Sequence, residues 1–191
     1  MELVWLIPVA GLAAVFYAGW LAWDVLRRDR GAREMQAIAD RIFEGAMAFL
    51  RRQYVTIAVL ALVAAIAIGV VLAVLSKEGS DVVKAHGQVG VGWRTAVAFL
   101  VGAFCSALAG FIGMIIAVKA NLRTAAGAAK GGLAEAVTIA MRAGAVSGFL
   151  IVALSMIGVT GIYYAYGGND HPDLAPFLIV GFGFGASFVA L

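Results

Sequence analysis

The stretch AVAFLVGAFCSALAGFIGMIIAV, residues 96–118, decides the fold because it runs for 23 residues without a charged side chain. A helix of about 20 apolar residues crosses the hydrocarbon core of a bilayer. The stretch is followed directly by KANLRTAAGAAKGG, residues 119–132, which is rich in small residues and carries two lysines and one arginine. These features predict a membrane-spanning helix that leaves the bilayer near Lys119 and continues as a polar tail.

Similar runs occur elsewhere in the chain. Tyr54–Leu75 and Ala143–Tyr166 lack charged residues over 22 and 24 positions, and Leu3–Leu26 contains only Asp24. Apolar residues make up 63% of the 191 residues, charged residues only 13%, and the mean hydropathy is +0.99. This composition excludes an average soluble domain. We expect an all-α polytopic transmembrane helix bundle, with residues 1–191 forming the N-terminal part of one transmembrane domain and five helices at about residues 3–26, 46–75, 93–120, 133–166 and 174–191.

The lysines and arginines predict the orientation, because short positively charged loops stay in the cytoplasm. Ten basic residues follow the first and third helices: Arg27, Arg28, Arg30, Arg33, Arg41, Arg51, Arg52, Lys119, Arg123 and Lys130. Only Lys77, Lys84 and Arg94 lie in the connection after the second helix, and no basic residue follows the fourth. The N-terminus is therefore expected outside a cell (inner) membrane. The basic residues are not interleaved with exposed aromatic residues, so we expect membrane lipid and not nucleic acid as a partner.

Residues 30–53 have an amphipathic pattern. Apolar side chains recur at steps of three and four (Met35, Ile38, Ile42, Ala46 and Phe49), and the opposite side carries Arg33, Gln36, Asp40 and Glu44. No proline separates this segment from Tyr54–Leu75, so both should form one long helix. Its cytoplasmic part either lies on the headgroups or projects beyond the bilayer, and both interpretations stay open.

Stripes of small residues predict close helix packing, since helices in lipid associate through close contacts rather than a hydrophobic drive. The stripes are Gly102, Ser106 and Gly110 in the third helix, Ala140, Gly144 and Gly148 in the fourth, and Gly181 and Gly185, followed by Ser187, in the fifth. We expect Gly110 to lie where two helix backbones touch. A leucine at this position would then force the helices apart.

Arg142 is bordered by apolar segments on both sides. An intramembrane charge is a functional hypothesis, yet an arginine at the end of a helix also serves as an anchor whose head group reaches the interface. Glu135 lies two turns earlier on the same face, and it would pair with Arg142 only through extended side chains or an intermediate group. Both interpretations of Arg142 stay open.

Three stretches taken together resemble the membrane-integral, ion-pumping pyrophosphatases. They are EGAMAFLRRQYVTI (44–57), GFIGMIIAVKANLRTA (110–125) with AMRAGAVSGF (140–149), and GFGFGASFVAL (181–191). They occur in the order and spacing of that family, and the resemblance covers nearly the whole chain. The orientation that the resemblance implies, with the N-terminus outside, agrees with the distribution of basic residues.

The resemblance implies a homodimeric enzyme with about sixteen helices per subunit. Such a hydrolase and translocase cleaves magnesium pyrophosphate in the cytosol and pumps protons or sodium ions outward, in some cases with potassium as a further cofactor. The family's Mg²⁺ ligands and catalytic carboxylates would begin just beyond the position of Leu191. No catalytic or metal-binding residue is therefore expected in this chain.

The resemblance also assigns expected roles to individual residues. Ser187, with Gly181 and Gly185, would be nearest to the ion path or would pack an inner helix. The remaining candidates are expected to have a supporting role: Asn121, Arg123, Thr124, Arg142, Gly102, Ser106 and Gly110. Nothing resembling an anchoring residue follows Ala190 and Leu191, so we expect the chain to be a fragment that ends inside a helix. Alone, it should insert into membranes without hydrolysing pyrophosphate.

Two alternative interpretations stay open. Half of a secondary transporter or channel would also use small-residue helices, but it is expected to contain interrupted helices and an ion site near the midplane. Proline and charge are missing from the centres of the second to fourth helices. A non-catalytic membrane scaffold is the other alternative.

The orientation is testable by cysteine labelling. Residues 27–53 and 119–142 should be cytoplasmic, and residues 76–95 and 166–173 external, because of the asymmetry in lysine and arginine. A cysteine at Ser80 should react with an impermeant reagent applied from outside. Reaction from the cytoplasmic side only would contradict this topology.

Overall fold

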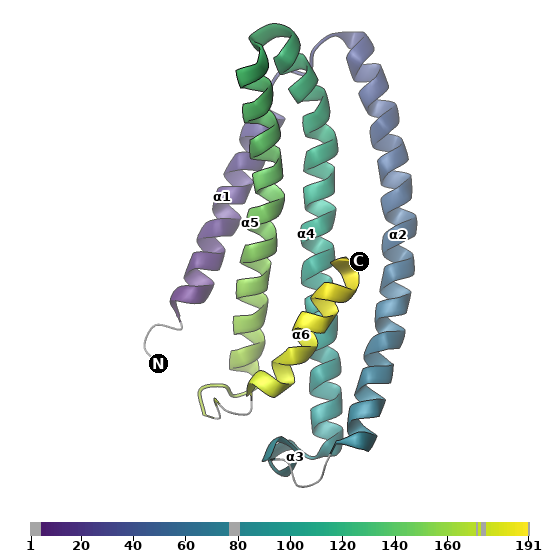
Figure 1. Cartoon of the computed structure of the whole chain (residues 1–191), viewed down its shortest axis with the longest axis vertical. Helices are drawn as coiled ribbons and strands as arrows, with labels where there is room; N and C mark the ends of the chain where they lie inside the picture. The colour runs from purple at the N-terminus through teal and green to yellow at the C-terminus, as the bar shows by residue number, and fades with distance from the viewer. Residues whose placement is uncertain (1–4, 77–80, 171, 173–174, 191) are drawn as a thin grey trace. The chain divides into compact units, whose positions relative to one another are not determined.

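The computed structural model describes residues 5–76, 81–170, 172 and 175–190. Every regular element within these residues is a helix, which confirms the all-α fold class (Figure 1). The elements are α1 (Leu6–Leu26), α2 (Arg33–Leu75), α3 (Asp81–His86), α4 (Gln88–Gly131), α5 (Leu133–Ala165) and α6 (Ala175–Ala190). The predicted continuity of the amphipathic segment with the second span is seen in α2, which is 43 residues long.

Four helices, α1, α2, α4 and α5, are long and apolar enough to cross a membrane. The fifth expected span is an apolar helix of 16 described residues, α6, which is shorter than the length that a span requires. Its expected ends at Leu174 and Leu191 lie outside the described residues, as does Leu3. Five spans are predicted, and four of them are long enough to cross a membrane among the residues that the structure describes.

The turn between α4 and α5 is a single residue, Gly132, with a φ of 79°. This left-handed conformation is accessible to glycine without steric cost, and it ends a helix sharply. The two long helices can therefore reverse direction without a loop. The short linker fixes the ends of α4 and α5 next to each other.

The helices form two compact units, described here one at a time. One unit contains residues 9–54 and 108–153, and we call it the charged unit because it holds the ion pairs described below. Within it, Tyr17 of α1 meets Phe149 of α5 edge to face at 4.9 Å between ring centroids. Ser147 of α5 also lies against Gly113 of α4, so α5 contacts a helix on either side.

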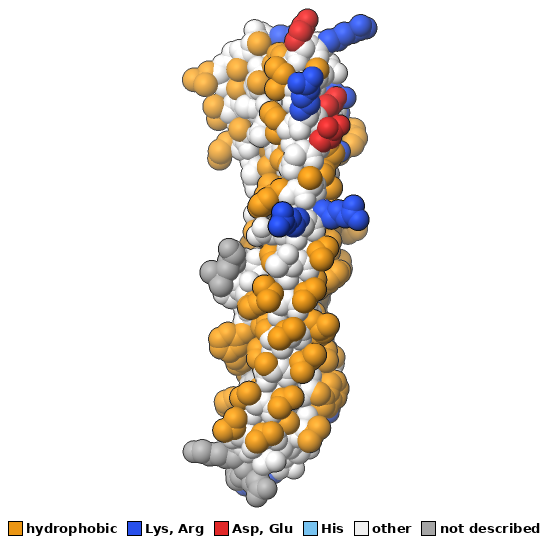
Figure 2. Space-filling view, turned by 90° about the vertical axis from the view of Figure 1, so that its right-hand side faces the viewer, with side chains coloured by type: hydrophobic (Ala, Val, Ile, Leu, Met, Phe, Trp, Pro, Cys, Tyr) orange, Lys and Arg blue, Asp and Glu red, His pale blue; other side chains and the backbone are white. Residues whose placement is uncertain are grey.

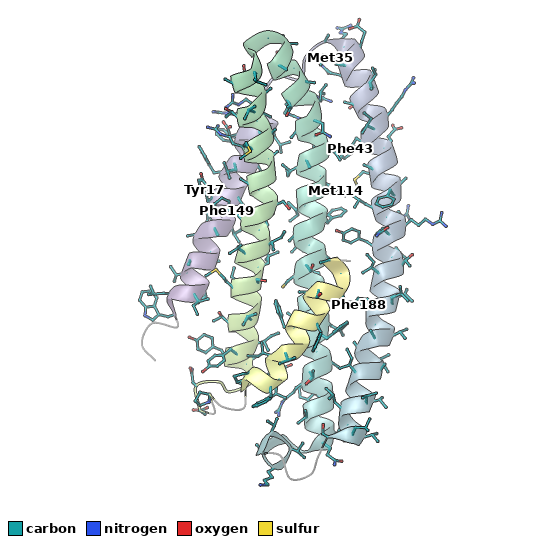
Figure 3. All side chains as sticks on the ribbon, viewed as in Figure 1. Tyr17, Met35, Phe43, Met114, Phe149 and Phe188 are labelled. Atoms are coloured by element: carbon teal, nitrogen blue, oxygen red, sulfur yellow. The ribbon has the colours of Figure 1, made fainter. Side chains whose placement is uncertain are left out.

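The other unit, called here the glycine-packed unit, contains residues 1–8, 55–107 and 154–191. Its core includes Ala61 and Ala65 of α2 and Phe99 and Ala103 of α4, and Phe188 of α6 packs against this cluster (Figure 3). The rings of Phe99 and Phe188 have centroids 5.7 Å apart.

Backbone contact between α4 and α6 is made through glycines. A Cβ atom added at Gly181 or Gly185 would overlap the carbonyl oxygen of Thr95 or Phe99, and one added at Gly102 would overlap that of Phe182. Glycines therefore let these two helices approach each other from both sides, as the small-residue pattern at 102, 181 and 185 predicted.

The described residues place no helix backbone against Gly110, where backbone contact is predicted. An added Cβ there would lie 2.9 Å from the Tyr54 hydroxyl group, which is the end of a side chain, and it would meet no helix backbone among the described residues. The stripe of Ala140, Gly144 and Gly148 on α5 is also exposed, and an added Cβ at either glycine meets open space. Helical spacing identifies a stripe but not the direction in which it faces.

The charged and apolar parts of α2 are separate along the helix. Figure 2, which faces α2, shows charged side chains on one part of this surface and hydrophobic side chains along the rest. In the amphipathic part, Ile38, Ile42 and Phe49 stay exposed by 62%, 56% and 58%. Their apolar stripe is thus left uncovered by the described residues.

Two glycines of α6 provide a matched test of the α4–α6 contact. We expect Gly185→Ala to destabilise the protein by about 1–3 kcal/mol, since its methyl group must displace the Phe99 carbonyl. Gly183→Ala should be neutral or slightly stabilising, because its methyl group meets open space and alanine favours helix. Thermal unfolding in detergent measures both. Equal midpoints for the two variants would contradict the contact.

Candidate functional site

Asp24, near the end of α1, is the centre of a cluster of charged residues in the charged unit. Its side chain is only 2% exposed and accepts hydrogen bonds from three arginines. Arg27 donates to Oδ1 from Nη2 at 2.9 Å and from Nε at 3.2 Å, and Arg28 donates to Oδ2 at 3.2 Å. Arg142 of α5 also donates to Oδ2. Residues three and four apart share one face of a helical turn, which explains why Arg27 and Arg28 reach the same carboxylate.

The cluster joins distant parts of the chain. Arg28 also contacts Oε1 of Glu135, at 3.5 Å, and so links the start of α5 to Asp24. The Arg142 guanidinium lies 5.9 Å from the ring centroid of Trp20, on the same helix as Asp24. Arg142 is therefore ion-paired with another helix rather than only anchored in the headgroups. Arg28 and Asp24 form the intermediate link between Glu135 and Arg142.

Arg123 binds the end of α1 in a different way. Its side chain is 8% exposed, and its Nε and Nη2 donate to the carbonyl oxygen of Leu26 at 3.2 and 2.8 Å. Its Nη1 donates to the carbonyl oxygen of Lys119 at 2.7 Å. The last carbonyl groups of a helix lack partners within the helix, so Arg123 satisfies one of them and ties α4 to α1. Asn121 is exposed and Thr124 is half-buried.

The connection between α1 and α2 is held by further polar contacts. Lys130 binds the Asp29 carboxylate, and Arg30 binds Asp40 at 3.1 Å. The hydrogen bond from Lys130 lowers the pKa of Asp29 below its ordinary value. Gln36 donates to the carbonyl oxygen of Gly31 at 2.9 Å. Because these ion pairs are exposed, each is expected to contribute little to stability.

These carboxylates do not fit a magnesium site. Mg²⁺ prefers carboxylate and water oxygens in an octahedral arrangement. Asp24, Asp29, Asp40 and Glu135 are each paired with an arginine or lysine. Among the described residues, no group of three or more His, Cys, Asp and Glu side chains is suited to a metal ion. No step of metal chemistry is assigned to them.

The candidates on α6 do not form one site. Gly181 and Gly185 are buried against α4, whereas Ser187 is exposed on another side of the helix. Gly102 is buried in the same α4–α6 contact, and Ser106 is half-buried. The structure thus brings Gly102, Gly181 and Gly185 together and separates Ser187 from them.

A family model described as "Inorganic H+ pyrophosphatase" matches residues 12–191. The chain belongs to this family. The predicted resemblance to ion-pumping pyrophosphatases is therefore confirmed, and with it a multi-pass membrane protein.

Several relatives within this pyrophosphatase family match nearly the whole chain. The "K(+)-insensitive pyrophosphate-energized proton pump 2" of Moorella thermoacetica is 52% identical over 191 residues, which is 100% of this chain and 25% of the relative. The "K(+)-insensitive pyrophosphate-energized proton pump" of Methanosarcina mazei is 40% identical over 190 residues, again 100% and 25%. The "Pyrophosphate-energized membrane proton pump 3" of Arabidopsis thaliana is 38% identical over 192 residues, or 96% and 23%. The chain thus spans about a quarter of their length.

Sequence reasoning missed Asp24 as the centre of the charged cluster. In the sequence, Asp24 is the single charge in the first apolar run, and helical spacing suggests Glu135 as the partner of Arg142. The signal was present, because charges bordering apolar segments of a membrane protein pair with one another. Asp24 and Arg142 are such charges, and the predicted orientation places both toward the cytoplasmic side of the membrane. Their separation of 118 positions hid the pair.

Substitution of Asp24 tests the cluster. Asp24→Asn leaves Arg142 and Arg28 without their carboxylate, and breaking a buried ion pair costs about 3–5 kcal/mol. For a chain of this size the unfolding midpoint should fall by roughly 10 °C. The matched control is Asp40→Asn, which removes an exposed carboxylate paired with Arg30. It should shift the midpoint by only about 2 °C.

A double-mutant cycle separates this pair from a general loss of charge. The variant with both Asp24→Asn and Arg142→Gln should lose less free energy of unfolding than the two single variants lose in sum. The reason is that the second substitution removes the unpaired charge that the first one leaves. Strict additivity, or equal effects of Asp24→Asn and Asp40→Asn, would show that the cluster contributes no more than a surface pair.

Proposed function

We propose that this chain is the first part of a membrane pump that couples pyrophosphate hydrolysis to outward translocation of protons. The match to the family over residues 12–191 carries this proposal. It is supported by relatives that are named pyrophosphate-energized proton pumps and match the whole of this chain at up to 52% identity. The uninterrupted course of α4 and α5 through their apolar segments gives no support to a secondary transporter.

We propose protons rather than sodium ions as the cargo, and an activity that does not require potassium. The names of the relatives support both choices, since they describe proton pumps and, for the Moorella and Methanosarcina proteins, potassium insensitivity. The family resemblance alone allows potassium as a further cofactor, whereas the names of these two relatives favour a pump without it.

We further propose that Mg²⁺ and pyrophosphate bind to other parts of the complete protein. Asp24, Asp29, Asp40 and Glu135 are bound by arginine or lysine, so they are not available to hold metal and phosphate. In this proposal the chain supplies supporting helices. Asn121, Arg123, Thr124 and Arg142 then stabilise the cytoplasmic ends of these helices, and Ser187 is the residue nearest to the ion path.

The location proposed for the pump is a cell membrane, with the N-terminus outside and two subunits forming a homodimer. The excess of arginine and lysine after α1 and in the second half of α4 supports this orientation. The dimer follows from the family resemblance alone.

A chimera tests the function. In this chimera, the present chain replaces the matching quarter of the Moorella relative. The chimera is expressed in cells, and inside-out membrane vesicles are prepared from them. We expect magnesium-dependent phosphate release from pyrophosphate, with acidification of the vesicle interior, because the two sequences are 52% identical over this region. Both activities should persist when choline replaces sodium and potassium at equal ionic strength. The 191-residue chain alone should reach the membrane and release no phosphate.

The controls keep the outcomes separate. A chimera with the thermal midpoint of the relative but no hydrolysis would refute the functional assignment. Hydrolysis without acidification in sodium-free buffer would refute protons as the cargo. Robust turnover by the chain alone would refute the assignment of the catalytic groups to other parts of the protein.

A further inference from the structure

The charged unit contains a cavity whose lining does not include Asp24 or Arg142. Its volume is about 420 Å³, and it is lined by residues from the end of α1, the amphipathic part of α2 and the polar part of α4. The lining consists of Leu26, Arg30, Ala39, Asp40, Phe43, Val118, Lys119, Leu122 and Arg123. Figure 3 shows Phe43, one of these lining residues, pointing from α2 toward α4.

The cavity carries an excess of positive charge. Arg30, Lys119 and Arg123 line it together with a single carboxylate, Asp40, which is bound by Arg30 at 3.1 Å. The Lys119 ammonium lies 5.2 Å from the ring centroid of Phe43, and no described residue offers it an acceptor within hydrogen-bonding distance. Lys119 therefore has donors available for an anion.

Arg123 adds further donors to this wall. Its three contacts with backbone carbonyl groups use one N–H each of Nε, Nη1 and Nη2. A guanidinium carries five N–H groups, so two remain. The side chain is 8% exposed and held by α1, which keeps its charge fixed at the cavity.

The position of the cavity along the helices indicates which anion is available. The uncharged run of α4 ends at Val118, and Val118 and Lys119 both line the cavity. The wall thus changes from apolar to cationic where the predicted span ends, which is the level of lipid phosphates. The predicted orientation places it in the cytoplasmic leaflet, which is the anionic one.

We propose that this cavity binds a phosphate group, supplied by the phosphodiester of an anionic lipid in the cytoplasmic leaflet or by free phosphate. Lys119 and the remaining N–H groups of Arg123 donate to the phosphate oxygens, and Arg30 contributes charge at the rim. Phe43, Leu26 and Leu122 offer apolar surface to the glycerol and upper acyl region of a lipid. This site depends on the predicted orientation and not on pyrophosphate hydrolysis.

Binding to the purified protein tests the proposal. Protein freed of lipid in a neutral detergent is titrated with phosphatidylglycerol, with phosphatidylcholine and with inorganic phosphate, and native mass spectrometry counts the bound molecules. We expect phosphatidylglycerol to bind more tightly than phosphatidylcholine. Lys119→Gln should weaken its binding at least about fivefold, since one basic residue near an anionic lipid surface contributes about 1 kcal/mol.

The matched control is Lys130→Gln, the same substitution on the same helix at an exposed lysine that binds Asp29 outside the cavity. It should leave binding unchanged, and Lys119→Arg should keep it within about twofold of the original protein, because the charge is retained. If Lys119→Gln lowers the thermal midpoint, Arg30→Gln compared with Arg33→Gln on α2 repeats the test with stable proteins.

The titrations with phosphatidylglycerol and with inorganic phosphate distinguish the two sources of the phosphate group. Lys119-dependent binding of phosphatidylglycerol supports the lipid, and Lys119-dependent binding of inorganic phosphate alone supports the free anion at the same site. Equal affinities for Lys119→Gln and Lys130→Gln in both titrations would overturn the proposal. These binding experiments do not use the pyrophosphatase chimera. The phosphate-binding cavity and the proposed pump function are therefore tested independently of each other.

Discussion

The charged unit depends on one constraint: a carboxylate buried at the end of an apolar helix must be neutralised where it lies. Asp24 is 2% exposed, and an ion in such surroundings is costly unless charge and hydrogen bonds compensate it. Arg27 and Arg28 supply part of this compensation from the same turn, and Arg142 supplies the rest from α5. The need of Asp24 for partners thereby fixes α1 against α5. Arg123 also attaches α4 to the end of α1, because it binds the carbonyl group of Leu26, two residues after Asp24.

The glycine-packed unit is held by a different interaction. In lipid, apolar side chains gain little by leaving the solvent, so helices associate where their backbones come close enough for dispersion contacts over a long surface. Gly181 and Gly185 place α6 against the carbonyl groups of Thr95 and Phe99, and Gly102 does the same for Phe182. The two units therefore illustrate the two means available to a membrane protein, which are a few strong polar contacts and many weak close ones.

Much of the fold could be predicted from the sequence, because membrane insertion depends on properties of single segments. Three uncharged runs and a fourth run with a single charge predicted the four spans, and the lack of proline between residues 30 and 54 predicted the continuous α2. The contacts were harder to predict, since they depend on which faces meet. Gly110, Gly144 and Gly148 belong to stripes with the same spacing as Gly181 and Gly185, yet among these five glycines only Gly181 and Gly185 touch a described neighbouring backbone. Asp24 was missed because its partner on α5 is 118 positions away.

The balance of charge separates the structural role of these residues from a role in binding anions. In the ion pairs formed by Asp24, Asp29, Asp40 and Glu135, acid and base neutralise each other, and the described contacts leave the carboxylates occupied. Lys119 and Arg123 differ because Asp40, the one acidic residue in the lining of their cavity, is already bound to Arg30, while their own charges face that cavity. Backbone carbonyl groups bind Arg123 and the Phe43 ring lies near Lys119, but these contacts supply no opposite charge. Water or an anion from outside completes the stabilisation of the two cations. At the end of an apolar span, where lipid phosphates lie, the anion is the better partner, because it supplies both charge and several acceptor oxygens to donors that are already held in place.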